Sequence, residues 1–139
     1  MAFLSSLDIV GSALTAERYR SEVILQNIAN TKTTMTASGE PYRRKQVVFE
    51  ERQLSFSDTL DKVQGGVQIG AIVESDRDFK PVYDPTHPQA DADGYVLYPN
   101  VDTTEEQIDL LAASNAYDAN MTVLSVVKAM IGKTLDMGK

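Results

Sequence analysis

Apolar residues recur at intervals of three or four residues through the N-terminal segment, from about residue 4 to about Asn30. This spacing predicts a helix, and no proline occurs before Pro41 to interrupt it. Gly11 and Arg18 break the apolar stripe, so we expect a narrow packing face. The residues that we expect to pack against neighbouring subunits from this helix are Leu7, Val10, Leu14, Leu25 and Ile28.

Two asparagines, Asn27 and Asn30, lie near the expected end of this helix. Asparagine tolerates the left-handed backbone conformation that closes many helices. A simple C-cap is therefore the first interpretation of both residues. A polar contact that fixes helix register is the second.

The C-terminal segment carries the strongest local signal. Asp102 is a good N-cap residue, and Glu105 and Glu106 fall in the first turn, where acidic groups complement the helix dipole. Apolar residues then continue without a breaker, which predicts a helix of about 34 residues and ~50 Å. Asn120 is a candidate polar register residue. The expected packing residues are Leu110, Leu111, Tyr117, Leu124, Val127, Ile131 and Leu135.

The middle of the chain has β character. Residues 42–50, 67–73 and 95–98 are rich in β-branched and aromatic residues and predict strands, and Gly65-Gly66 predicts a turn. Residues 80–99 hold four prolines and predict an ordered loop. We therefore expect an α+β fold, with long N- and C-terminal helices paired as a coiled coil and a small β-rich middle domain. The expected division is 1–30, 31–100 and 101–139.

The C-terminal helix is apolar over more than one face, which predicts more than one neighbour. The middle domain is too small to cover two long helices. We expect other copies or other subunits to cover the remaining apolar surface.

Composition removes several classes of chemistry. The chain has 139 residues, enough for one domain, and it has no cysteine, which excludes disulfides, thiolate nucleophiles and cysteine-ligated metals. Its formal charge of −7 argues against a nucleic-acid partner and against docking on anionic lipid. No secretory signal peptide and no membrane-inserted segment are expected.

No catalytic, cofactor-binding or metal-binding site is predicted, and we expect no enzyme activity. His87, the single histidine, lies in the proline-rich loop with no nucleophile nearby in the sequence. The segment 91–94 resembles part of a calcium loop, but the first and last ligand positions do not match, so a tight turn is the better interpretation. The basic run 43–45 is interpreted as a solvated or interfacial strand edge.

Several ordered motifs resemble the flagellar axial protein family, which includes rod and hook proteins. Residues 11–18 and 27–31 look like its N-terminal signature, and residues 117–120 followed by 128–130 look like its C-terminal signature. Asn115 and Gln26 depart from the residues common in the family. The segments 39–49, 82–85, 87–91, 94–96, 99–102 and 133–139 are similar to those of proximal-rod members.

The resemblance implies a structural subunit of the proximal rod, the basal-body drive shaft. Such a subunit polymerises through its terminal helices into a helical tube that transmits torque for motility. The implied location is the rod within the periplasm, reached by type III export without cleavage of a signal peptide. The implied partners are copies of the chain, rod proteins of the FlgB, FlgF and FlgG types, the FliE-type junction protein, the MS ring and the flagellar type III export apparatus.

Three alternatives remain open at this point. The first is a different flagellar axial rod subunit. The second is a β-domain adaptor that oligomerises through coiled-coil ends. The third is a small enzyme or ligand-binding module, for which a stable monomer with a ligand-induced shift in melting temperature would argue.

Overall fold

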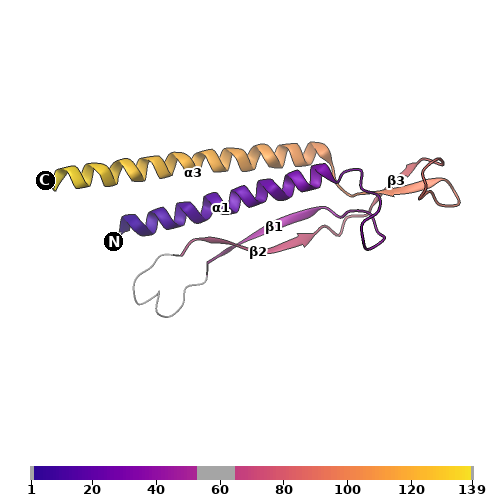
Figure 1. Cartoon of the computed structure of the whole chain (residues 1–139), viewed down its shortest axis with the longest axis horizontal. Coiled ribbons are helices and arrows are strands. Elements are labelled where there is room, and N and C mark those ends of the chain that lie inside the picture. The colour runs from indigo at the N-terminus through magenta and orange to yellow at the C-terminus, as the bar shows by residue number, and fades with distance from the viewer. Residues whose placement is uncertain (1, 53–64, 139) are drawn as a thin grey trace.

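Two long antiparallel helices run along most of the length of the molecule (Figure 1). The structure is a computed structural model that describes residues 2–52 and 65–138. Helix α1 (Ala2–Ala29) has 28 residues and helix α3 (Thr103–Met137) has 35, which correspond to ~42 and ~52 Å. The helices lie side by side, with both chain termini at the same end of the molecule. The predicted α+β class with a paired N- and C-terminal helix is therefore confirmed.

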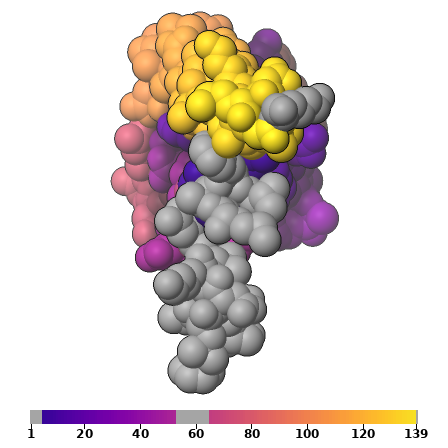
Figure 2. All heavy atoms as spheres, turned by 90° about the vertical axis from the view of Figure 1, so that its left-hand side faces the viewer, coloured from indigo at the N-terminus to yellow at the C-terminus, as the bar shows by residue number. Residues whose placement is uncertain are grey.

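The register of the pair leaves the end of α3 beyond α1. Asn27 in the last turn of α1 contacts Glu106 in the first turn of α3. Because the helices are antiparallel, the start of α1 lies opposite the turn around Ile131. The last turn of α3 therefore extends past its partner, and this end of α3 is nearest the viewer in Figure 2.

The first hairpin packs along α1. Strands β1 (Lys45–Glu51) and β2 (Val67–Glu74) pair antiparallel, with Lys45 opposite Glu74 and an irregularity between Val48 and Phe49. Both strands contact α1, which lies between the hairpin and α3 (Figure 1). Among the described elements, the N-terminal helix therefore packs against both the hairpin and α3, whereas α3 packs against α1 alone.

The glycine pair at 65–66 does not form the predicted tight turn. The Gly66 carbonyl accepts a hydrogen bond from the Arg52 N–H at 2.8 Å, so Gly66 extends the β1–β2 ladder. A Cβ at Gly66 would lie 2.6 Å from the Ser12 hydroxyl oxygen of α1. Glycine is needed here because the strand backbone approaches the helix closely.

A second hairpin projects from the end where α1 ends and α3 begins (Figure 1). Strands β3 (Lys80–Tyr83) and β4 (Tyr95–Tyr98) pair antiparallel in a sheet separate from β1–β2. The prediction of a loop through 80–99 is wrong for β3, because proline is tolerated in the edge strand of a two-stranded sheet. The tight turn predicted at 91–94 is confirmed. Gly94 has φ of 78°, and its N–H donates to the Asp91 carbonyl at 2.9 Å.

The buried core of the described chain is thin. It follows the α1–α3 contact and the junction between the helices and the strands. Many large apolar side chains on α3 remain exposed in the single chain. The buried apolar residues are Val10, Ala16, Val23, Ile24, Tyr42, Val96, Val101 and Ala113.

Candidate functional site

One face of α3 packs toward α1 with alternating steps of four and three residues. Glu106 and Ala113 on this face are fully buried at 0 % exposure. The same spacing continues along α3 through half-buried residues as far as the turn opposite the start of α1. This is the pattern of a coiled-coil seam. The predicted packing residues on this seam are Leu110, Tyr117, Leu124, Val127 and Ile131, together with Asn120.

The predicted packing residues of α1 divide into two groups. Val10 is buried, and Leu7, Leu14 and Ile28 are half-buried. Leu25 is 52 % exposed and lies on the solvent-facing side of α1. On α3, Leu111 and Leu135 are exposed by 63 % and 67 %, so the single chain does not cover them.

A second apolar row runs along α3 and was only partly recognised from the sequence. We call it the outer stripe and define it as Ile108, Val123, Val126, Met130 and Met137. At 100° per residue, this row lies about 120° around the helix from the seam. The exposed fraction of its residues ranges from 46 % at Val123 to 87 % at Met137. No described part of the chain covers it.

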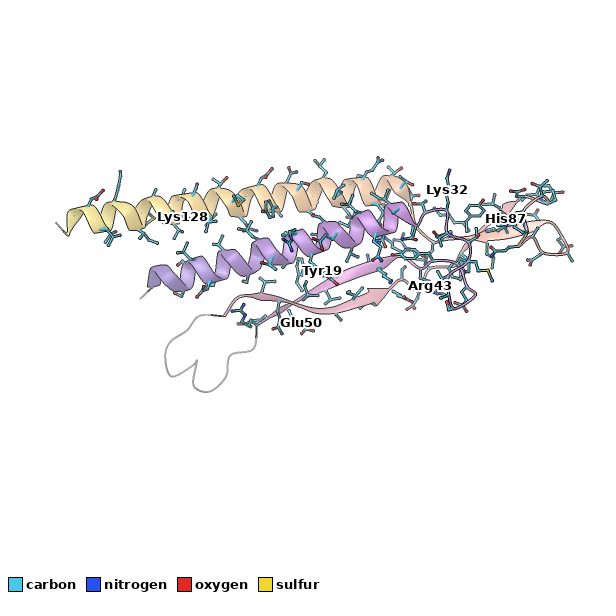
Figure 3. The ribbon with its side chains drawn as sticks, in the orientation of Figure 1. Tyr19, Lys32, Arg43, Glu50, His87 and Lys128 are labelled. Carbon is cyan, nitrogen blue, oxygen red and sulfur yellow. The ribbon has the colours of Figure 1, made fainter. Side chains whose placement is uncertain are left out.

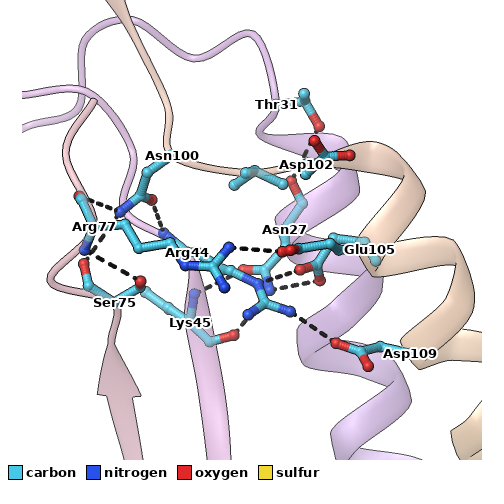
Figure 4. A network of polar contacts seen from close by, with 12 residues as sticks. Asn27, Thr31, Arg44, Lys45, Ser75, Arg77, Asn100, Asp102, Glu105 and Asp109 are labelled. Carbon is cyan, nitrogen blue, oxygen red and sulfur yellow. Dashed lines mark hydrogen bonds and ion pairs between the residues drawn. The ribbon is translucent and has the colours of Figure 1, made fainter. Parts of the chain in front are cut away.

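A buried polar network joins α1, β1 and α3 near the end of the helix pair (Figure 4). Arg44 lies just before β1 and is 5 % exposed. Its Nε donates to Glu106 Oε1, and its terminal nitrogen donates to Asp109 Oδ2 at 2.7 Å. The network therefore contains a buried ion pair between the strand region and the start of α3.

Asn27 uses its whole side-chain amide within this network. Its Nδ2 donates to the Lys45 carbonyl at 2.8 Å and to Glu106 Oε2 at 2.9 Å. Its Oδ1 accepts from the Lys45 N–H at 3.0 Å and from the Tyr42 hydroxyl at 2.9 Å. An amide offers two donors and two acceptor positions, so Asn27 is fully satisfied while only 1 % exposed.

Asn100 plays a comparable part on the other side of Arg44. Its Oδ1 accepts from the Arg44 N–H at 2.8 Å. Its Nδ2 donates to the carbonyls of Ser75 and Arg77 at 3.1 and 2.8 Å. This one side chain fixes the start of β1 to the segment that links β2 to β3.

The network changes the proton affinity of two of its members. Burial, together with the nearby charges of Glu106 and Glu74, raises the pKa of Tyr42 to about 12. Burial acts to lower the pKa of Arg44, but the hydrogen bond and charge of Glu106 and the charge of Asp109 outweigh it and raise that pKa. Tyr42 therefore remains a hydroxyl donor and Arg44 remains a cation through the physiological range.

The basic run 43–45 is interpreted from the sequence as a solvated or interfacial edge, and this interpretation is wrong for Arg44. That residue is buried and pairs with Glu106 and Asp109 of the same chain. The flanking Arg43 matches the expectation better, since it is partly exposed and its guanidinium lies 4.4 Å from the ring centroid of Phe79. Arg43 and Lys128 are labelled in Figure 3.

The candidate capping residues have different roles. The Asn30 side chain donates to the Gln26 carbonyl at 2.8 Å, which is a capping contact at the end of α1. The Asp102 side chain accepts from the Thr104 N–H at 2.9 Å, which makes it the N-cap of α3, and this contact lowers its pKa. Asn27 caps nothing. Asn120 lies half-buried on the seam, and its role in register stays a prediction.

Nothing in the described chain has the form of a catalytic centre. His87 lies in the β3–β4 hairpin (Figure 3), where its Nδ1 accepts from the Gln89 N–H at 3.2 Å. Among residues 2–52 and 65–138, no group of three potential metal ligands comes together. No helix in the same ranges is long and apolar enough to cross a membrane.

Sequence reasoning missed the network, although one signal was present. Glu106 occupies the first position of the four-and-three spacing that continues through Leu110 and Ala113, so its side chain had to enter the helix seam. A charge at such a position requires a partner. Its partner Arg44 is far away in the sequence, and no local pattern identifies it.

Comparison with known proteins identifies the family. Residues 92–137 match the family model described as flagellar basal body rod FlgEFG protein C-terminal. Three similar proteins are each named flagellar basal-body rod protein FlgC, from Bacillus subtilis (strain 168), Escherichia coli O6:H1 and Salmonella typhimurium (strain LT2). Their identities are 42 %, 44 % and 43 %, and each match covers 100 % of both chains. The chain therefore belongs to the FlgC family of flagellar basal-body rod proteins.

Proposed function

We propose that this chain, a structural subunit of the flagellar basal-body rod, polymerises into a helical tube through the outer stripe of α3. The observation that carries the proposal is that α3 has two apolar faces, of which the described part of the chain covers one. The seam of α3 packs against α1, whereas no residue in the described ranges covers the outer stripe, which lies about 120° away. An apolar face of this kind marks a surface that a second neighbour covers.

Burial of the outer stripe supplies the driving force for association. Each square ångström of apolar surface removed from water contributes roughly 25 cal/mol before the entropy cost of association. Val126 and Met130 lie at the middle of the C-terminal half of the stripe, exposed by 53 % and 51 %. We expect them to become the most deeply buried residues of the subunit contact.

The contact between subunits is heterologous. The outer stripe of one copy is not needed for its own seam, so it remains free to meet a different surface on the next copy. Contacts of this type repeat along a helix instead of closing into a dimer. Torque is transmitted through many such contacts, and the Arg44–Glu106 network keeps the first hairpin fixed to the helices under that load.

The finer placement extends the same proposal. The chain belongs to the proximal rod in the periplasm, next to rod proteins of the FlgB, FlgF and FlgG types, the FliE-type junction protein and the MS ring. It leaves the cytoplasm through the flagellar type III apparatus without cleavage. It has no catalytic activity. Segments 1–30 and 101–139 form the inner tube wall, and 31–100 faces outward.

Purification of basal bodies from a strain that carries an epitope-tagged chain tests the proposal. We expect the chain to co-purify with the rod, at the intact mass of the uncleaved polypeptide, and deletion of its gene to abolish motility. Image reconstruction of these basal bodies then locates α1 and α3 in the tube wall. A chain that stays soluble while complete rods are recovered would contradict the proposal and favour the oligomerising adaptor.

A further inference from the structure

Strand β2 has a free edge with which no described strand pairs. Among the described helices and strands, β2 contacts β1 and α1 alone, and its C-terminal half forms the margin of the ribbon away from α3 (Figure 1). We propose that residues 70–74 of this edge add a strand from a different protein, an extended apolar segment flanked by lysine or arginine. The contact lies apart from the outer stripe, and it rests on the proposed function only for the place where the partner is met, the basal body.

The hydrogen-bond register decides which backbone groups of β2 face this edge. The Ser75 N–H donates to the Arg44 carbonyl at 2.8 Å, so these two residues form a hydrogen-bonded pair. Such pairs alternate along an antiparallel ladder, so the next hydrogen-bonded position on β2 is Val73. Ile72 and Glu74 therefore point their N–H and carbonyl groups away from β1. No residue in the described ranges bonds to these outward groups.

Side chains of α1 close two other edge positions of the same hairpin. On β1, the Asn27 amide bonds to both the N–H and the carbonyl of Lys45. On β2, the Ser12 hydroxyl accepts from the Val67 N–H at 3.1 Å. Helix α1 thus meets the β1 edge at one end of the hairpin and the β2 edge at the other. This crossing leaves the β2 edge at 70–74 without a partner from α1.

The half-strand 70–74 is apolar and open on both faces. All five of its residues are exposed. Ile72 and Val73 point to opposite faces and are exposed by 45 % and 48 %. Strand β2 contains neither lysine nor proline, which guard many natural edge strands. An edge of this kind is a template for strand addition, in which main-chain hydrogen bonds supply the affinity.

Acidic side chains flank the free edge and decide what it accepts. A Cβ at Gly70 would collide with the Glu50 side chain, so the Glu50 carboxyl group lies over Gly70 (Glu50 is labelled in Figure 3). Glu74 ends the strand, Asp76 and Asp78 follow it, and all three are exposed. An incoming strand with lysine or arginine beside its apolar residues complements this charge.

The basic residues that follow or face the end of β2 are engaged elsewhere. Arg77 pairs with Glu105 at 2.8 Å, and Lys80 lies 3.5 Å from Asp102. Lys45 lies opposite the last residue of β2, with its ammonium group 5.6 Å from the centroid of a tyrosine ring. The surroundings of the free edge therefore remain acidic.

The same acids argue against a second copy of this chain as the occupant. Pairing of two β2 strands about Ile72 would place Glu74 of each copy opposite Gly70 of the other, next to the Glu50 carboxylate. The free edge of β1 carries Glu50 and Glu51 and has the same sign. Like charges that lie directly opposite destabilise a sheet. The described strands are already paired in hairpins, so these copies offer no free strand of the right charge.

Proline at position 72 tests the contact without opening the hairpin. Because the Ile72 N–H points outward, Ile72→Pro removes a bond to the added strand and leaves the β1–β2 ladder intact. Ile72→Ala loses the same side chain but keeps the N–H, so it is the matched control. We expect the motility halo to shrink roughly twofold or more in Ile72→Pro relative to Ile72→Ala, because main-chain bonds supply the affinity. Circular dichroism of the two purified chains should agree.

Cross-linking in purified basal bodies identifies the occupant, because the native chain has no cysteine. Ala71→Cys lies on the half-strand and is treated with a short thiol–amine cross-linker, which joins it to a lysine of the neighbour. We expect a product that is heavier by the mass of a different protein. Glu74→Lys in the same chain should reduce this product severalfold. Asp93→Lys, in the exposed turn of the other hairpin, is the control and should leave it unchanged.

The outcomes separate this inference from the proposed function. A product of twice the mass of the chain overturns the different protein as the occupant. Basal bodies that contain the chain but give no cross-linked product, with equal halos for Ile72→Pro and Ile72→Ala, overturn strand addition and leave the rod assignment intact. Absence of the chain from the basal bodies overturns both.

Discussion

Asn27 of α1 and Glu106 of α3 meet across the helix pair, with Asn27 Nδ2 2.9 Å from Glu106 Oε2. The same amide also completes two backbone hydrogen bonds with Lys45. One side chain therefore fixes the register of the helices and holds the start of β1 against them. The apolar seam alone allows sliding by a helical turn, whereas this buried polar contact does not.

Replacement of Asn27 should destabilise the chain more than its size suggests. Asn27→Ala leaves the Tyr42 hydroxyl, the Glu106 carboxylate and the Lys45 backbone short of partners in a buried place. We expect a loss of about 3 kcal/mol in the free energy of unfolding, measured by urea denaturation. Asn30→Ala, at the exposed end of the same helix, is the matched control and should cost less than about 1 kcal/mol.

The buried pair Arg44–Glu106 should show strong coupling in a double-mutant cycle. Arg44→Met or Glu106→Leu alone leaves a buried charge without its main partner, which costs about 3–5 kcal/mol. The double variant should cost clearly less than the sum, with a coupling energy above about 1.5 kcal/mol.

The exposed pair Arg77–Glu105 provides the control cycle. Its nitrogen–oxygen distance is 2.8 Å, but both side chains are about half exposed to water. Its coupling should stay below about 1 kcal/mol. Equal coupling in the two cycles would show that burial of Arg44 does not matter.

Tyr42 should give the chain a loss of stability at alkaline pH. Its pKa is about 12 in the folded chain, against 10.0 for the ordinary phenol of the unfolded chain. Below pH 10 the hydroxyl keeps its proton in both states, so Tyr42 contributes no pH dependence there. Between pH 10 and 12 the unfolded state loses the proton first. The free energy of unfolding then falls by about 3 kcal/mol as pH rises through this window.

Denaturation curves at several alkaline pH values, with tyrosinate absorbance recorded alongside, measure this effect. Tyr42→Phe should remove the alkaline loss, while costing about 1 kcal/mol at neutral pH through the hydrogen bond to Asn27. Tyr83→Phe, exposed on the second hairpin, should keep it. If Tyr42→Phe loses as much stability at alkaline pH as the native chain, the effect does not come from Tyr42.

Two glycine substitutions should have opposite signs. Gly94→Ala places a Cβ 2.9 Å from the Tyr83 ring at a positive φ of 78°, so the β3–β4 hairpin should lose about 1 kcal/mol or more. Gly132→Ala lies within α3 with no atom in the way, and should stabilise the helix by about 1 kcal/mol. Thermal unfolding compares the two, and a stabilising Gly94→Ala would show that the turn is not strained by a side chain.

The elements with strong local signals were predictable. Asp102 and the unbroken run of apolar residues after it identify α3, and enrichment in β-branched and aromatic residues identifies β1 and β2. β3 was missed, because the prolines at 81 and 85 mask a strand that exists only through pairing with β4.

The buried network was beyond sequence reasoning for a different reason. Arg44 and Glu106 are separated by 62 residues, and each has a good local interpretation on its own. Arg44 belongs to a basic run, and Glu106 complements a helix dipole. Only the antiparallel register of α1 and α3 brings them together, and no periodicity in one segment reports that register.

The central claim is that the outer stripe of α3 holds subunits together and is not needed for the fold of one chain. Val126→Asp/Met130→Asp measures it most directly, with Ser125→Asp, off the stripe on the same helix, as control. Circular dichroism of the purified chain should remain unchanged, while the variant should be lost from basal bodies and motility should disappear. Rods that retain the double variant, with normal motility, would contradict the account.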